Sequence, residues 1–141
     1  MFYKPMLLPL LAMIFLTFAV WVHMYVTRLS EIKRKSIDPQ SLATRVDSQA
    51  LLTNSTAQAD NLKNLFELPV LFYVAVLLDL ELMIQDQLLV QLAWGYVVLR
   101  YIHSLVHCTY NRVMHRFVVY TASCLVLMLL WARLGAYVLT H

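Results

Sequence analysis

The chain has 141 residues, of which 61% are hydrophobic and 13% are charged, and its formal net charge is +3. This composition argues against a soluble globular domain, in which about a quarter of the residues are charged. The basic residues gather at the ends of apolar runs, which indicates membrane topology and argues against a nucleic-acid partner. With two glycines and four prolines, the chain has too few turn residues for a small β-barrel, so an all-α membrane protein is predicted.

The first apolar run covers residues 6–26, about the 20 residues that are needed to cross a hydrocarbon core of ~30 Å. A secretory signal peptide would have a shorter apolar stretch of about 7–15 residues and a small-residue cleavage site, so we expect this segment to be retained. The polar and basic segment that follows, residues 28–60, is predicted to be a long surface loop.

Three further spans are predicted at residues 61–83, 88–110 and 117–139. Because lipid offers no hydrogen-bond partners, each span must be a helix. The second and third connections are short, which favours an integral membrane four-helix bundle of up-down topology. Most of the lysine and arginine lies in the first and third loops, so the positive-inside rule places these loops in the cytoplasm. The compact loops and the lack of a transit peptide favour a bacterial inner membrane.

The third span carries a polar stripe that needs an explanation. Arg100, His103, His107 and Tyr110 are spaced so that they fall within a sector of roughly 80° on a helix. An ionisable group at the centre of a span costs about 2.5–3.5 kcal/mol, so such residues usually have a role. These four positions are therefore candidates for a functional or structural polar network.

A second polar stripe lies at the start of the second span, where Asp60, Asn64 and Glu67 share one helix face. One interpretation is structural: Glu67 neutralises Arg100 or another arginine as a buried ion pair that fixes helix register. The other interpretation is that the two stripes together form a binding site.

Metal or haem binding is a further alternative. His103 and His107 are separated by one helical turn, and His23 is a third histidine in an apolar run. A metal site needs three or four ligands, and no carboxylate or thiolate lies beside these histidines at matching spacing. We therefore expect no metal.

The motifs of the two stripes resemble those of a known family. These motifs are Asn64-Leu-Phe-Glu67-Leu-Pro69, then Arg100-Tyr-Ile-His103, then an arginine at position 116. Together they resemble the MAPEG family, the membrane-associated proteins of eicosanoid and glutathione metabolism. A lone Arg-x-x-His would be weak evidence, but the resemblance covers nearly the whole chain, including four spans, a long first loop and the spacing between motifs.

The resemblance implies a homotrimer of four-helix subunits in contact with membrane lipids. Glutathione, as co-substrate, would bind between neighbouring subunits near the cytoplasmic side, and a lipophilic substrate would enter from the bilayer. Arg116 would lie near the sulfur as the catalytic residue, because a nearby guanidinium favours the nucleophilic thiolate. Lys33 or Arg34 could replace Arg28 as the partner of a glutathione carboxylate. The residues implied for glutathione binding are Arg28, Asn64, Glu67, Arg100, His103, His107 and Tyr120.

One departure from the family pattern concerns the reaction. Where the eicosanoid-synthesising members carry a tyrosine, this chain has His107, and the nearest tyrosine is Tyr110. The leading hypothesis is a membrane-bound glutathione-dependent transferase or peroxidase that acts on a lipophilic electrophile. The alternative is a non-catalytic trimeric membrane module that binds lipid or docks a partner, with a polar network that is only structural.

Overall fold

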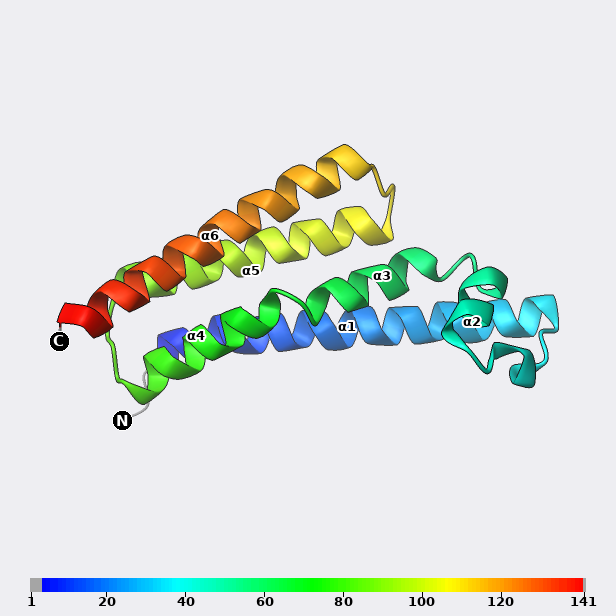
Figure 1. Ribbon diagram of the computed structural model, residues 1–141, viewed down its shortest axis with the longest axis horizontal. Helices are drawn as coiled ribbons and strands as arrows, with labels where there is room; N and C mark the ends of the chain where they lie inside the picture. The colour runs from blue at the N-terminus through cyan, green and yellow to red at the C-terminus, as the bar shows by residue number, and fades with distance from the viewer. Residues whose placement is uncertain (1–3, 141) are drawn as a thin grey trace.

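The computed structural model describes residues 4–140, and within this range the chain contains helices and no strand. The prediction of an all-α fold is therefore confirmed. Figure 1 shows the elements in chain order: α1 (Lys4–Lys35), the 3-10 helix η1 (Pro39–Leu42), α2 (Arg45–Leu51), α3 (Thr56–Leu65), α4 (Pro69–Glu81), α5 (Gln87–Cys108) and α6 (Val113–Thr140).

Three helices of the described chain are long and apolar enough to cross a membrane, namely α1, α5 and α6. The most apolar windows of these helices have mean hydropathies of 2.2, 1.2 and 1.9, respectively. This confirms the prediction of an integral membrane protein. The 32 residues of α1 rise about 48 Å, so this helix is longer than a ~30 Å core and reaches beyond the predicted end of the first span.

The region predicted as the second span, residues 61–83, is not one continuous helix. It contains the end of α3 and all of α4, which are separated by a turn at residues 66–68. Pro69 explains the break, because its ring excludes a normal helical hydrogen bond and fits best at the first position of a helix. With 13 residues, α4 rises about 20 Å and is too short to cross a ~30 Å core alone.

The region predicted as a loop, residues 28–60, holds the last turns of α1, then η1, α2 and the first half of α3. A long-range contact within this region is made by Glu31, a buried residue with 2% exposure. The Glu31 carboxylate accepts a hydrogen bond from Lys35 Nζ at 2.6 Å, and both carboxylate oxygens accept from the backbone N–H of Asn54 at 3.1 Å. These bonds tie the start of α3 to the end of α1, so that α3 returns alongside α1 (Figure 1).

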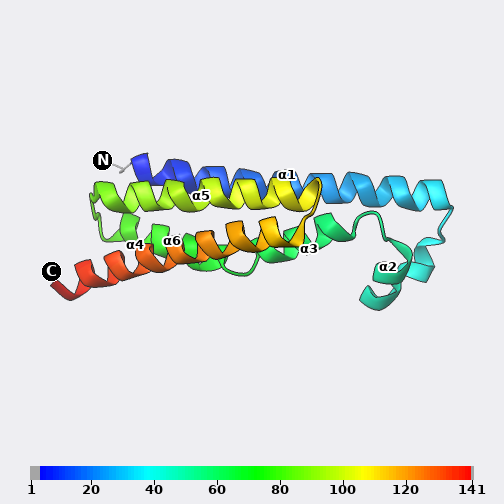
Figure 2. The same ribbon diagram turned by 90° about the horizontal axis from the view of Figure 1, so that it is seen from above.

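The helices form two packed groups. The α5–α6 hairpin lies against a group made of α1, α3 and α4, as the two views show (Figures 1 and 2). The groups meet at buried apolar side chains, where Phe72 of α4 stacks on Tyr96 of α5 at 4.9 Å. The Tyr101 hydroxyl also donates to the backbone carbonyl of Ala12 at 2.6 Å. This packing places α3, the second half of α5 and the start of α6 next to one another.

Candidate functional site

Arg100 lies at the centre of the site and is completely buried. Its Nη2 atom donates a hydrogen bond at 3.1 Å to the backbone carbonyl of Asn64, in the last turn of α3. The guanidinium carbon lies 5.5 Å from the centre of the Tyr120 ring, which is a cation–π distance. The Nε and Nη1 atoms have no hydrogen-bond partner. Arg100 therefore braces the break between α3 and α4 and still has donors that are unused.

A cavity of about 200 Å³ opens beside Arg100, between α3, α5 and α6. It brings together four of the residues that the sequence singled out. The lining residues are Asn64, His103, Val113, Arg116, Phe117 and Tyr120. The rings of His103 and Tyr120 are 5.7 Å apart. The described lining contains an arginine and a histidine but no carboxylate, so the cavity suits an anionic or strongly polar group.

Arg116 is held by two side chains at the connection between α5 and α6. Its Nη1 atom donates to Asn111 Oδ1 at 2.8 Å and lies 3.4 Å from His107 Nε2. Because a guanidinium can only donate, His107 must accept through Nε2 and carry its proton on Nδ1. Asn111 has a φ of 48°, a left-handed conformation that asparagine adopts more readily than most residues. His107 and Asn111 thus hold the guanidinium at the edge of the cavity.

Glu67 and Arg28 lie elsewhere, in a polar pocket of about 630 Å³ between α1, α2 and α3. Lys33 and Arg34 do not line this pocket. The ion pair between Glu67 and Arg100, which was one interpretation of the sequence, is not formed. Arg100 donates to a backbone carbonyl, and Glu67 lines the other pocket. In one protomer the predicted residues therefore do not share one cavity. Asn64, His103, Arg116 and Tyr120 line one cavity, Arg28 and Glu67 line the other, and Arg100 and His107 line neither.

The sequence interpretation missed two buried residues that join α3 to α5. Asn61 is fully buried, and its Oδ1 accepts from Ser104 Oγ at 3.2 Å while its Nδ2 donates to Cys108 Sγ at 3.4 Å. The signal was present, because Asn61 precedes Asn64 by one turn and Ser104 and Cys108 are also one turn apart. This contact fixes the height at which α3 presents Asn64 to the cavity.

The two histidines of α5 pack edge to face, with ring centres 5.6 Å apart. Within residues 4–140, no group of three histidine, cysteine, aspartate or glutamate side chains is close enough to hold a metal ion. What the arrangement offers chemically is a guanidinium, an imidazole and a phenol around one small cavity. Such groups stabilise negative charge through charge-assisted hydrogen bonds.

Comparison with known proteins adds one finding. No curated protein and no solved structure matches the chain. The MAPEG family model matches residues 6–136, a range that contains the cavity, the helix break and all three membrane-capable helices almost completely. The chain therefore belongs to the MAPEG family.

Proposed function

We propose that the protein is a membrane-bound glutathione-dependent transferase or peroxidase that acts on a lipophilic electrophile. In this proposal, α3 and α4 together make a fourth membrane crossing, and the first and third connections are cytoplasmic. The subunit works as part of a homotrimer. Family membership supports a glutathione-related role in the membrane, and the cavity at Arg116 supports the choice of this site.

The observation that carries the proposal is the unsatisfied cationic character of the cavity region. Arg100 is fully buried with two nitrogen atoms that have no partner, and Arg116 lines the adjacent cavity. A buried charge whose donors are only partly satisfied and that has no anionic partner is costly, so it is retained where a ligand completes it. Glutathione carries two carboxylates and a thiol that ionises, and it would satisfy these donors.

The trimer is proposed because the residues for glutathione are divided between two cavities. Arg28 and Glu67 line one pocket, while Arg116 and Tyr120 line another on the other side of α3. If the Arg28 pocket of one protomer faces the Arg116 cavity of its neighbour, a peptide thiol can contact both. The site would then be complete only between subunits.

Arg116 has a defined role in this mechanism. A free thiol has a pKa of about 8.5, so at neutral pH most of it is protonated. A guanidinium close to the sulfur favours the thiolate, which attacks the electrophilic carbon. The carbon–sulfur bond forms while the electron pair of the broken bond leaves with the departing group. His107 and Asn111 hold Arg116 in place for this step.

The test is to add glutathione and a generic electrophile to the purified protein in detergent. We expect turnover, and we expect glutathione to raise the thermal unfolding temperature by mass action. Arg116→Ala should lower the turnover about 100-fold, which is typical for the loss of a charge-stabilising group. Arg116→Lys should restore only part of it, because lysine lacks the planar donor fork.

Arg112→Ala is the matched control, because Arg112 is exposed in the same connection and does not line the cavity. It should leave the turnover unchanged. If the wild-type protein shows neither turnover nor stabilisation by glutathione, the proposed function is wrong.

A non-catalytic module is a second candidate, and the bond between Arg100 and the Asn64 carbonyl favours it. In this case the polar network would only stabilise the helix break in a trimer that binds lipid or docks a partner. Arg116→Ala would then leave the function intact. A change at Arg100 would instead lower the unfolding temperature without any effect on a thiol reaction.

A further inference from the structure

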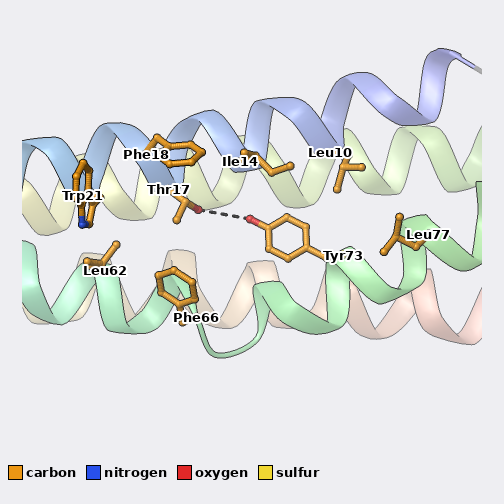
Figure 3. A pocket seen from close by; sticks show the side chains of 9 residues that line it. All are labelled: Leu10, Ile14, Thr17, Phe18, Trp21, Leu62, Phe66, Tyr73 and Leu77. Carbon is orange, nitrogen blue, oxygen red and sulfur yellow. Dashed lines mark hydrogen bonds between the residues drawn. The ribbon is translucent and has the colours of Figure 1, made fainter.

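The contact between His107 and Arg116 can form in one way only, unlike a hydrogen bond between two hydroxyl groups. The hydroxyls of Thr17 and Tyr73, for example, lie 3.4 Å apart between α1 and α4, and either oxygen can be the donor (Figure 3). A guanidinium has donors and no acceptor. Arg116 Nη1, which lies 3.4 Å from His107 Nε2, can therefore bond to this nitrogen only while it carries no proton.

A second proton on His107 would reverse the character of this contact. Both ring nitrogens of a charged imidazole are donors, so Nε2 could no longer accept from Arg116. Two positive groups would then face each other at hydrogen-bond distance. His107 is 2% exposed, so water screens this repulsion only weakly. Protonation of His107 therefore breaks the contact.

The charged and titratable groups that face His107 come from three helices. Arg100 and His103 belong to α5 itself, Arg116 belongs to α6 and Asp60 to α3. Two guanidiniums thus stand against one carboxylate, so a positive charge on His107 meets net repulsion. This repulsion acts most directly on Arg116, because its Nη1 atom is in contact with the imidazole ring.

Arg116 is also the arginine that can yield to this repulsion. It is half-buried at the start of α6, whereas Arg100 is completely buried and bonded to the Asn64 carbonyl. The other partner of Arg116 is Asn111, which lies in the exposed connection between α5 and α6. Arg116 can therefore turn toward solvent with Asn111 and leave the edge of the cavity.

We propose that the protonation state of His107 regulates the reaction at this site. Neutral His107 accepts from Arg116 and holds it beside the cavity, whereas protonated His107 releases it, so the reaction slows in acid. This inference rests on the proposed function, because it concerns the thiol that Arg116 would activate. His107 does not line the cavity and acts through Arg116, so it is a positioning residue.

The pH dependence of turnover, compared with that of His107→Gln, tests the proposal. The amide oxygen of glutamine can accept from Arg116, but it stays uncharged in acid. Ionisation of the thiol affects both proteins, and the ratio of their turnover numbers cancels it. We expect the ratio of wild type to His107→Gln to be constant near neutral pH and to fall in acid by as much as about tenfold per pH unit.

A second substitution and a control complete the series. His107→Phe has no acceptor, so its turnover at neutral pH should be about three- to tenfold below that of wild type, the equivalent of one hydrogen bond. His115→Gln is the matched control, because His115 is an exposed histidine at the start of α6 that bonds to Tyr110 and not to Arg116. Its pH profile should coincide with that of wild type.

Nitrogen NMR of histidine-labelled protein gives a readout that does not need turnover. The resonances of His107 are those that disappear in His107→Gln. At neutral pH they should show a proton on Nδ1 and none on Nε2, and in acid a proton on both. A proton on Nε2 at neutral pH would overturn the proposal, because Arg116 would then have no acceptor on His107.

The remaining outcomes separate this proposal from the proposed function. Absence of turnover in wild type at every pH would refute the proposed function itself. Turnover with a constant ratio of wild type to His107→Gln would refute only the regulation by His107. A loss of the acid effect in His115→Gln would also refute it, because the titrating group would then be another histidine. If His107→Gln does not fold, the same ratio is taken with His107→Phe, whose remaining turnover should lack the acid effect.

Discussion

The two halves of α5 carry charged groups whose partners differ in kind. Where the helix begins, Asp86 accepts a hydrogen bond from Arg133 Nε at 2.7 Å and another from the backbone N–H of Leu88 at 2.9 Å. In the second half, Arg100 is fully buried, and its described hydrogen bond goes to the uncharged carbonyl of Asn64. One end neutralises its charges within the protomer, and the other does not.

This difference indicates where a ligand is expected. A guanidinium that leaves water costs several kcal/mol unless an anion and hydrogen bonds compensate it. At the Asp86 end, the compensation is already present, so that end needs nothing further for stability. At the Arg100 end, two donors are left over beside a cavity that contains another arginine. Such local departures from good packing are typical of functional sites.

The largest expected effect is that of a substitution at Arg100. Arg100→Gln keeps a donor for the Asn64 carbonyl but removes the charge. We expect glutathione to bind roughly 10- to 100-fold more weakly, because hydrogen bonds to a charged group contribute about 1.5–3 kcal/mol. Isothermal titration in detergent measures this. Arg133→Gln, at the end of α5 where Asp86 is paired, should leave the affinity for glutathione unchanged. Equal losses of affinity in the two variants would refute the distinction between the two ends of α5.

Substitution of Asn111, which lies just after α5 at the Arg100 end, should have a smaller effect on the reaction. Asn111→Gly removes the 2.8 Å bond to Arg116 but tolerates the left-handed backbone. We expect the turnover number to fall about three- to tenfold, the equivalent of one hydrogen bond, while the affinity for glutathione stays constant. Asn111→Ala should show the same kinetic loss and, in addition, lower stability by roughly 1–2 kcal/mol because of its positive φ. A kinetic loss in Asn111→Ala that is absent in Asn111→Gly would mean that the side chain does not position Arg116.

Much of the fold follows from the sequence because lipid limits the choices. Long apolar runs must be helices in a membrane, and this rule alone predicts α1, α5 and α6. The break at Pro69 was harder to predict, because proline is also tolerated inside membrane helices. Within residues 28–60, Asp38 and Thr44 cap η1 and α2, but the return of the chain along α1 involves Glu31 bonding to Asn54 far along the chain, and hydropathy cannot detect such a contact.

The candidate site was less predictable from the sequence than the membrane helices were. Helix periodicity placed Arg100, His103 and His107 on one face of α5, and all three are buried. Tyr110, the fourth member of the predicted stripe, lies beyond the end of α5 and is exposed. The partner of Arg100 was not predictable, because the acceptor is the backbone carbonyl of Asn64 next to the helix break, and a backbone acceptor carries no sequence signal. The separation of Glu67 from Arg116 depends on which face of α3 meets α1, and tertiary packing decides that orientation.

Where α5 begins, at the ion pair between Asp86 and Arg133, substitutions should lower the stability of the fold and leave ligand binding unchanged. Asp86→Ala removes both the cap of α5 and the partner of Arg133. The cap is worth about 1 kcal/mol, and an exposed ion pair adds 0.2–1 kcal/mol at most. Asp86→Asn keeps a capping acceptor and should lose only the second contribution. Thermal unfolding in detergent compares the two, and an effect of either variant on glutathione affinity would contradict the assignment.

The smallest effect is the pH dependence of this pair. Burial acts to raise the pKa of Asp86, but the hydrogen bonds from Arg133 and from Leu88 and the positive charge of Arg133 outweigh it, so the pKa is lowered. A lowered pKa in the folded state means that the stabilisation is complete above the unfolded value of about 3.9 and is lost as the pH falls through the folded pKa. The wild-type protein should therefore unfold at a higher temperature than Asp86→Asn near neutral pH, and the two curves should converge in acid. Curves that stay parallel from neutral pH down to about pH 3 would show that the charge of Asp86 contributes nothing, and the pair would then differ from Arg100 in geometry alone.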